Sequence, residues 1–353
     1  MFMISPIFNM FKVRFDIMDK LGVLDRNSAY TIICINLENV FKTILTSRIN
    51  NYYIASKTPN ELKLELMSNI INLAQHYNLY CAKVKQKAKI VLYWNYPNAP
   101  YRNNKYIELY KDYYSNRMFN SMDCGYIMKC IHECHNFMKT MCKYVNNVYI
   151  IDATEIDSSV VPMIIKNNKF DMKNTQYLLV SNSKYDYQYV NLGFDIICPR
   201  GKDSVLLNTT NVVDYLKSIN NIKTKLTMSP NHISFALSLI GDKYRCIPKM
   251  NGVGLSTIIS CINKAVDNLI ITDNTTNVDM LASILSESFR HQFTINYKCT
   301  DILSQYNEAS ASNIDDVISQ VCDKYDTNSL DYINDKYFRQ YPIMIVRSIY
   351  EVI

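Results

Sequence analysis

The sequence predicts an α/β protein whose central sheet is mostly parallel and flanked by helices. Five short apolar runs rich in β-branched residues are typical of strands buried on both faces. Residues 59–77, between the first two runs, have the apolar spacing of an amphipathic helix. Strands that alternate with helices favour a parallel sheet. The predicted strands are residues 30–35, 90–94, 148–151, 177–180 and 194–198.

Helical patterns dominate the C-terminal part of the chain. From about Asn208 onward the strand signal fades and apolar residues recur at helical spacing. We therefore expect an α/β domain over residues 1–205 and a helical domain over residues 206–353. The sequence between them contains no flexible Gly/Ser linker, so the two parts are expected to pack as one body. The predicted helices of the second part are residues 211–219, 232–240, 255–267 and 278–289.

The composition is that of a globular protein. The chain has 353 residues, of which 48% are hydrophobic and 20% charged, and this excludes a disordered or fibrous protein. Lys and Arg number 38 against 32 Asp and Glu, which gives a net charge of +6. So mild a basic excess permits a polyanionic partner without requiring one.

The cysteine pattern predicts a reducing compartment. Eleven Cys in 353 residues are too sparse for a disulfide scaffold, and none forms a Cys-x-x-Cys pair. The N-terminal apolar stretch lacks the features of a signal peptide, and no run approaches the roughly 18 apolar residues of a membrane span. We expect a cytoplasmic or other reducing intracellular compartment, no secretion and no membrane partner.

Residues that follow the predicted strands are the first candidates for a functional site. In an open parallel sheet, ligands bind beyond the carboxyl ends of the strands, where the strand order reverses. Four of these strand ends carry polar side chains: Asn36, Asn95, residues 152–158 and residues 181–188.

A window in the helical part, LIGDKYRCIPKMNGVGLSTII at residues 239–259, carries the first sign of a family. It resembles the G-D-x-S-D-N-I-P-x-x-x-G-I-G signature of 5′-nucleases, the flap-endonuclease-like branch of the PIN-like superfamily. Tyr244, Arg245 and Cys246 replace the Ser, Asp and Asn of that signature. The matching residues are Gly241, Asp242, Ile247, Pro248, Gly252 and Gly254.

The strand ends resemble further motifs of the same family, in the same order. After the third strand, TEIDSSV is similar to E-A-D-D, with Glu155 and Asp157 retained and Ser158 in place of the last Asp. The fourth strand leads into VSNSKYDYQYV, similar to S-x-D-K-D-x-x-Q-L. Ser181, Lys184 and Gln188 match this motif, and Ser183 and Tyr185 stand where it has Asp.

Two more motifs complete the resemblance, which covers about residues 30–259. The first strand leads into CINLENV, similar to I-D-G-x-N, with Asn36 at the Asp position and Asn39 at the Asn position. The second leads into a segment similar to F-D-G followed by basic residues and a Tyr-Lys pair. The corresponding residues are Asn95, Arg102, Tyr110, Lys111 and Arg117.

The resemblance implies a more detailed organisation. It implies a PIN-like nuclease domain at residues 1–205, with a helical arch at about 98–145. It also implies a helix-hairpin-helix at about 232–268 within the helical domain, followed by a C-terminal extension.

The acidic cluster that the family uses is depleted in this chain. Family members hold two metal ions with carboxylates, and the metals activate water and stabilise the leaving oxygen. Nine acidic positions of the pattern here carry three acids, five neutral residues and one cation, so their formal charge changes from −9 to −2. We therefore expect no catalytic residues and no cofactor. The nine positions are Asn36, Asn95, Glu155, Asp157, Ser158, Ser183, Tyr185, Asp242 and Arg245.

Arg245 is the most informative departure. A guanidinium would repel a metal ion but can donate paired hydrogen bonds to Asp242 or Asp157, so we expect it to fill the place of a cation. In the alternative of an active enzyme, Glu155, Asp157 and Asp242 would hold Mg²⁺ or Mn²⁺. A shifted alignment of the motifs would favour this alternative, because Glu38, Asp152 and Asp186 lie within two or three residues of the positions that have lost an acid.

Two regions are candidates for nucleic-acid binding. In the family, the hairpin with the G-x-G grips DNA phosphates, because Gly lets the main chain approach closely and the next helix presents its N-terminus. The predicted arch mixes basic and Tyr residues. This mixture favours binding of a single DNA strand and a solvated charged face over a Tyr-rich core about equally. The alternative for the hairpin is that Gly252 and Gly254 only close a tight turn between two helices. The predicted nucleic-acid-binding residues are Arg102, Lys105, Lys111, Arg117, Lys184, Lys249, Gly252, Gly254, Ser256 and Thr257.

CIHECH, at residues 130–135, invites a zinc interpretation because it gathers thiols and imidazoles. Its spacing does not match the paired ligands of structural zinc sites, so buried, reduced Cys in a packed helix is the favoured alternative.

The leading functional hypothesis is a 5′-nuclease-like protein with weakened or no catalysis. It would bind branched, flap or single-stranded DNA, or assemble a replication, repair or transcription complex with protein partners. The first alternative is an active 5′-3′ exonuclease or flap endonuclease that depends on divalent metal. A second is a structural adaptor without nucleic-acid binding. A viral or phage source is compatible with such a chain.

Overall fold

The computed structural model describes residues 11–25, 27–37, 39–40, 58–94, 124–142, 147–168, 174–223, 228–241, 247–250, 255–267, 271–272, 275–276, 285 and 287–322. Several predicted features lie outside these residues. They include most of the arch and the residues Glu38, Asn95, Arg102, Lys105, Lys111, Arg117, Asp242, Arg245, Gly252 and Gly254.

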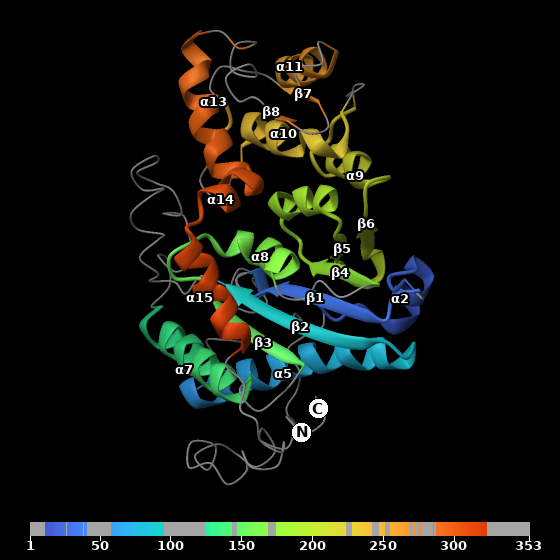
Figure 1. Cartoon of the computed structure of the whole chain (residues 1–353), viewed down its shortest axis with the longest axis vertical. Helices are drawn as coiled ribbons and strands as arrows, with labels where there is room; N and C mark the ends of the chain where they lie inside the picture. Colours follow the sequence, from blue (N-terminus) through green and yellow to red (C-terminus); the bar gives the residue numbers. More distant parts are fainter. Residues whose placement is uncertain are drawn as a thin grey trace.

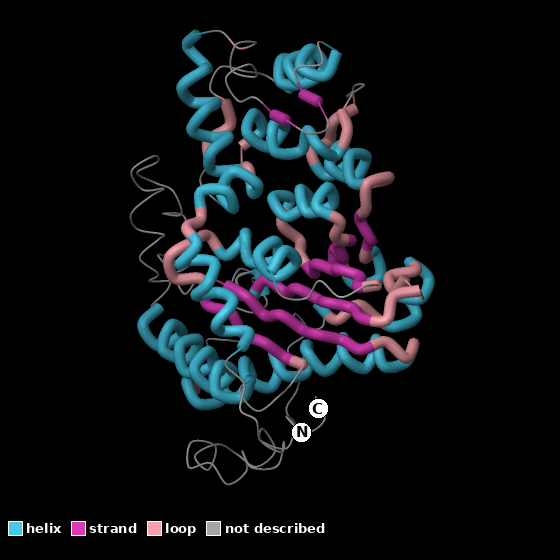
Figure 2. The backbone as a smooth tube through the Cα atoms, in the orientation of Figure 1, coloured by secondary structure: helices cyan, strands magenta, loops and turns pink. Residues whose placement is uncertain are grey.

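The described chain contains a six-stranded sheet in the order β3-β2-β1-β4-β5-β6. Figure 2 draws its strands in magenta. The first five strands are parallel, and β6 runs antiparallel to β5. This confirms the predicted mostly parallel sheet flanked by helices. The strands are β1 (Tyr30–Asn36), β2 (Lys87–Trp94), β3 (Val148–Asp152), β4 (Thr175–Val180), β5 (Asp195–Cys198) and β6 (Val205–Leu207).

The strand order reverses between β1 and β4. From β1 the chain adds β2 and then β3 on one side, and it returns to add β4, β5 and β6 on the other. In open sheets of this kind the crevice at the carboxyl ends of the two central strands is the usual ligand site. The ends of β1 and β4 therefore mark the place where a site is expected.

Helices bury both faces of the sheet. α5 (Pro59–Lys83) and α7 (Cys124–Cys142) lie along one face, and α8 (Val161–Asn168) covers the other (Figure 1). Ile33 and Ile35 of β1 belong to the core on the α5 and α7 side, while Ile32 and Cys34 belong to the core on the α8 side. Burial on both faces explains why the strands are continuous apolar runs.

The ends of α5 follow from its sequence. Thr58 and Glu61 form a capping box, with Pro59 at the first helical position. The helix continues past the predicted end at residue 77 because Tyr80 and Cys81 extend its buried stripe. A shorter helix, α2 (Phe15–Leu21), packs near the C-terminal end of α5, where Tyr80 donates a hydrogen bond to Asp19.

A second group of helices stands beyond the α8 side of the sheet (Figure 1). It has its own core, in which Phe235 and Leu239 of α10 meet Ile258 and Ile262 of α11 and Phe293 of α13. The group comprises α10 (Ile233–Ile240), α11 (Leu255–Asp267), α13 (Glu287–Thr300) and the short pair β7 (Ile271–Thr272) and β8 (Thr275–Thr276), whereas α9 (Val212–Ile219) buries Val212 and Leu216 in the core on the α8 side. Whether α10 and α11 form a helix-hairpin-helix stays a prediction.

The chain then returns to the sheet. α14 (Ile302–Glu308) packs against the 3₁₀ turn η2 (Ser158–Val160), and α15 (Ala311–Cys322) packs against β3 and α8. Ile302, Val317 and Val321 are buried in the core on the α8 side. The C-terminal helices are thus part of the packing of the α/β layer. No helix among those described is long and apolar enough to cross a membrane.

Gly241 fixes the chain where it leaves α10. Its φ is +75°, and a Cβ built on it would lie 2.5 Å from the Lys249 nitrogen and 2.7 Å from the Ile247 oxygen. Both the backbone conformation and the close approach of the returning chain require glycine here. The Met250 amide completes the closure by donating to the Leu239 carbonyl at 3.3 Å.

Gly241→Ala should lower the free energy of unfolding by about 3 kcal/mol or more, because it combines an unfavourable φ with a clash against main chain. Gly22→Ala is the matched control, since Gly22 also has a positive φ of +62° but nothing lies within 4 Å of its Cβ position. That variant should lose about 1 kcal/mol. Urea denaturation of both variants measures the difference, and equal losses would contradict the close approach.

Candidate functional site at the carboxyl edge of the sheet

A hydrogen-bonded chain of polar side chains links the ends of β1 and β4. The Asn39 main-chain amide donates to Asn36 Oδ1 at 3.3 Å, and Asn39 Nδ2 donates to Ser181 Oγ at 3.2 Å. Ser181 Oγ in turn donates to Asp186 Oδ2 at 2.5 Å, and it accepts from the Ser183 amide at 3.0 Å. These side chains lie where the strand order reverses, and the structure brings together Asn36, Ser181 and Ser183.

Asp186 is the acid that this network contains. It lies in the 3₁₀ segment η3 (Lys184–Leu192) and its exposed fraction is 0%. The sequence motif placed Ser183 and Tyr185 at the acidic positions and named Asp186 only as a shifted alternative. Burial, with the negative charge of Asp186 adding to it, raises the pKa of Tyr189 well above its usual value.

The acids after β3 have separate surroundings. Glu155 is exposed, and its main-chain carbonyl accepts a hydrogen bond from Asn313 of α15 at 3.2 Å. Asp157 is buried and caps η2, because its Oδ1 accepts from the Ser159 amide at 2.9 Å. Ser158, the third position of this motif, is buried inside η2. Asp157 therefore has a structural role at the start of a turn.

Tyr185, at another acidic position of the motif, is joined to the C-terminal helices. Its hydroxyl donates to Gln305 Oε1 at 2.7 Å, and the two side chains are only 1% and 6% exposed. Gln305 Nε2 donates to the carbonyls of Cys299 at 3.1 Å and Lys298 at 3.3 Å. The Gln305 amide therefore satisfies the phenol and the end of α13 at the same time.

Gln188 makes a second link of the same kind. Its Nε2 donates to the Thr300 carbonyl at 2.8 Å, and its Oε1 accepts from the Ile302 amide at 3.3 Å. The segment between α13 and α14 is thereby fixed against η3. The amide side chains of Gln188 and Gln305 therefore lie beyond the ends of β3 and β4.

The described residues do not fit a two-metal cluster. Mg²⁺ and Mn²⁺ require several oxygen ligands with enough negative charge to offset the ions. Asp157 caps a turn, Glu155 is exposed and Tyr185 donates to an amide. Within the described parts of the chain, no group of three or more His, Cys, Asp or Glu side chains could hold a metal ion.

Four of the predicted nucleic-acid-binding residues lie in the described chain. Lys184 is half-buried, and its Nζ donates to Asn220 Oδ1 at 3.4 Å, which holds it at the end of α9. Lys249 is exposed beside the closure at Gly241, and Ser256 and Thr257 are exposed in the first turn of α11. Lys249, Ser256 and Thr257 are therefore accessible to a ligand, whereas Lys184 already contacts the protein.

The thiols of α7 pack in the core. Cys130, Cys134 and Cys142 are buried in the cluster that joins α7, α5 and the sheet. Burial raises the pKa of the Cys134 thiol, and nearby Cys130 adds to the effect. These residues have the environment of small hydrophobic side chains, which favours packing over the zinc interpretation.

No protein-family model and no curated protein matches the sequence. Solved structures similar to this chain include the D15 protein of T5 co-crystallised with metal ions, with a TM-score of 0.49 and 10% identity over 83% of this chain and 97% of that chain. The bacteriophage T5 D15 flap endonuclease in a pseudo-enzyme–product complex with DNA and metal ions also has a TM-score of 0.49 and 10% identity, over 82% of this chain and 99% of that chain.

A third similar structure is the T5 5′-exonuclease with bound zinc ions, with a TM-score of 0.47 and 12% identity over 83% of this chain and 98% of that chain. These proteins belong to the class that the sequence motifs resemble.

The hydrogen bond between Tyr185 and Gln305 should be measurable as a coupling energy. Tyr185→Phe removes only the hydroxyl and should lower the free energy of unfolding by about 1–2 kcal/mol, because the buried Gln305 oxygen loses its nearest donor. Combined with Gln305→Leu in a double-mutant cycle, the two changes should show an interaction of about 1 kcal/mol. Additive losses in urea denaturation would show that the contact contributes nothing.

Proposed function

We propose that this chain is a nuclease-fold protein that binds DNA without cleaving it. The observation that supports this proposal is that side chains at the strand ends form hydrogen bonds with other groups of the protein. Tyr185 bonds to Gln305, Asp157 caps η2, and Asn36 joins the network of Asn39 and Ser181. Side chains committed to such contacts are not available to assemble metal-bound water for phosphodiester cleavage.

The residues outside the described chain extend the same proposal. Among the nine positions, Asn95 supplies no charge, and Arg245 supplies a positive one next to Asp242 in the motif. A guanidinium paired with Asp242 would satisfy that carboxylate without a metal ion. We therefore propose that Arg245 takes the place of a cation in the remaining part of the site.

Retention of DNA binding rests on charge and exposure. The chain carries a net charge of +6, and Lys249, Ser256 and Thr257 are exposed near the start of α11. A Lys side chain, hydroxyl groups and main-chain amides at a helix N-terminus are all groups that bind phosphate. The DNA that it binds is branched, flap or single-stranded, as the family resemblance implies. The bound DNA would place the protein in a replication, repair or transcription complex.

The purified protein should leave 5′-flap, nicked and single-stranded DNA uncut in Mg²⁺ and in Mn²⁺. Gel analysis of end-labelled substrates checks this result over a range of protein concentrations. Cleavage that disappears in the Asp157→Ala variant would contradict the proposal and would establish the active nuclease instead. Cleavage that persists in that variant but is lost in Asp186→Asn would also contradict the proposal, whereas cleavage that persists in both variants would indicate a contaminating nuclease.

The same DNAs serve to measure binding at two salt concentrations. Affinity should fall steeply as salt rises, because phosphate contacts release counterions. Lys249→Ala should weaken binding and reduce the slope of log affinity against log salt concentration by about one. Lys20→Ala, which removes an exposed Lys on α2, is the control and should have no effect. Absence of binding at low salt would exclude DNA binding and leave the adaptor as the function of the fold.

A further inference from the structure

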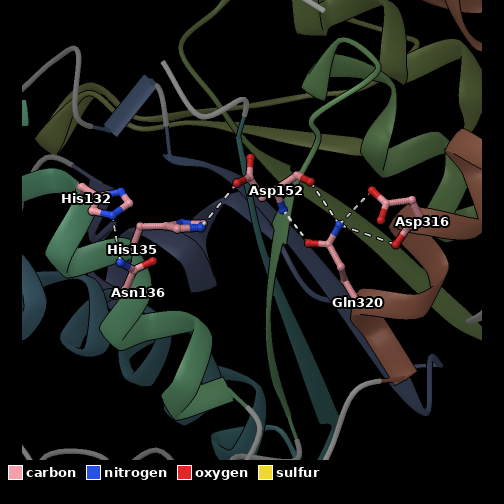
Figure 3. A network of polar contacts seen from close by, with 6 residues as sticks. All are labelled: His132, His135, Asn136, Asp152, Asp316 and Gln320. Atoms are coloured by element: carbon pink, nitrogen blue, oxygen red, sulfur yellow. Dashed lines mark hydrogen bonds and ion pairs between the residues drawn. The ribbon is translucent and has the colours of Figure 1, made fainter. Parts of the chain in front are cut away.

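Three elements meet at Asp152, the last residue of β3. His135 of α7 approaches its carboxylate from one side, with His135 Nε2 3.5 Å from Asp152 Oδ2. Gln320 of α15 approaches its main chain from the other side (Figure 3). The Asp152 amide donates to Gln320 Oε1 at 2.9 Å, and Gln320 Nε2 donates to the Asp152 carbonyl at 3.0 Å.

The main-chain contacts of Gln320 have a clear physical reason. β3 is the end strand of the described sheet and pairs with β2 alone, with Asp152 opposite Trp94. The Ala153 amide donates to the Trp94 carbonyl, so the amide and carbonyl of Asp152 face away from β2. Main-chain groups on an edge strand need other partners. The Gln320 side chain supplies both a donor and an acceptor, as a neighbouring strand would.

The contact between His135 and Asp152 is mostly buried. His135 is 6% exposed, and its ring lies 4.8 Å from the Trp94 ring, measured between centroids. Burial lowers the pKa of His135 to about 3, and the positive charges of Lys139 and His132 add to the effect. The imidazole is therefore neutral near pH 7, and its Nε2 makes a polar contact with the Asp152 carboxylate at 3.5 Å.

We propose that Asp152 is a junction that couples the position of α7 to that of α15. Gln320 fixes the main chain of Asp152, and the fixed main chain holds the carboxylate beside His135. Displacement of α15 would release the end of β3 and, with it, the contact between Asp152 and α7. Because coupling between two sites is reciprocal, displacement of α7 would loosen α15 to the same extent.

The elements on either side give this junction its significance. α7 lies within the segment predicted to form the arch, about residues 98–145, and α15 ends the run of C-terminal helices that packs on β3 and η2. A ligand or partner that moves one of these regions would therefore change the stability of the other. The coupling follows from contacts within the chain and does not depend on DNA binding.

Hydrogen exchange of backbone amides tests the coupling. In Gln320→Ala, amides of residues 131–142 in α7 should exchange about tenfold faster than in the unmodified protein, which corresponds to about 1.4 kcal/mol. Amides of the central strands β1 and β4 serve as the internal reference, because faster exchange there would report a loss of global stability. An unchanged rate in α7, or the same increase in α7 and in the central strands, would overturn the proposal.

Asn313→Ala is the matched control variant. Asn313 also lies on α15 and also donates an amide hydrogen to a main-chain carbonyl, that of Glu155, but it does not contact Asp152. Exchange in α7 should stay at the level of the unmodified protein. Conversely, His135→Phe, which keeps a ring against Trp94, should raise exchange in residues 312–322 of α15. Faster α7 exchange in Asn313→Ala equal to that in Gln320→Ala would show a general effect of α15 and contradict a specific junction.

A measurement on the unmodified protein does not depend on the folding of any variant. In low concentrations of urea, amides of α7 and α15 should lose protection in one opening step with the same urea dependence. Opening of α15 at a lower free energy, with α7 still protected, would show that the two helices are independent.

Discussion

Hydrogen bonding at the carboxyl edge of the sheet is the constraint on which the rest of the site depends. The ends of β1, β3 and β4 leave polar main-chain and side-chain groups that are removed from bulk water and must find partners. In this chain many of those partners are amide side chains. Gln305 accepts a hydrogen bond from Tyr185, and Gln320 donates one to the Asp152 carbonyl. Gln188 joins η3 to the segment between α13 and α14.

These amide contacts join the C-terminal helices to the edge of the sheet. Apolar residues of α14 and α15 complete the core on the α8 side, while their amide side chains reach main-chain and hydroxyl groups beyond the strands. A neutral amide offers a donor and an acceptor on one planar group, so it satisfies a phenol or a peptide group without any change in charge. A carboxylate at the same places would need a cation or a proton, and this explains how the edge can be stable with few acids.

The strands were predictable from the sequence because the sheet is buried on both faces. Their apolar runs stand out, and β1 to β4 exceed the predicted strands by one to three residues where polar ends continue the pairing, as in Lys87 of β2, while β5 begins one residue later than predicted. β6 gave no such signal, since it is a three-residue edge strand that is only partly buried. The fold class needed only the alternation of strands and helices.

The site was less accessible to sequence reasoning. The motifs follow the observed strand ends and place Ser183 and Tyr185 at acidic positions; in the structure the 3₁₀ turns of η3 bring Asp186, which the sequence offered only through a shifted register, to Ser181. An acid between two buried tyrosines, Tyr185 and Tyr187, was the signal that could have identified it. Gln305 and Gln320 gave no signal, because they lie more than 100 residues from their partners in ordinary amphipathic helices.

The central claim is that internal hydrogen bonds, not metal ions, hold this edge of the sheet. Titration of the metal-free protein with Mn²⁺, followed by electron paramagnetic resonance of the free ion, tests it most directly. The account predicts no saturable binding to the unmodified protein and no change on Asp157→Ala. Saturable binding of Mn²⁺ that is lost in Asp157→Ala or in Asp186→Asn would contradict it.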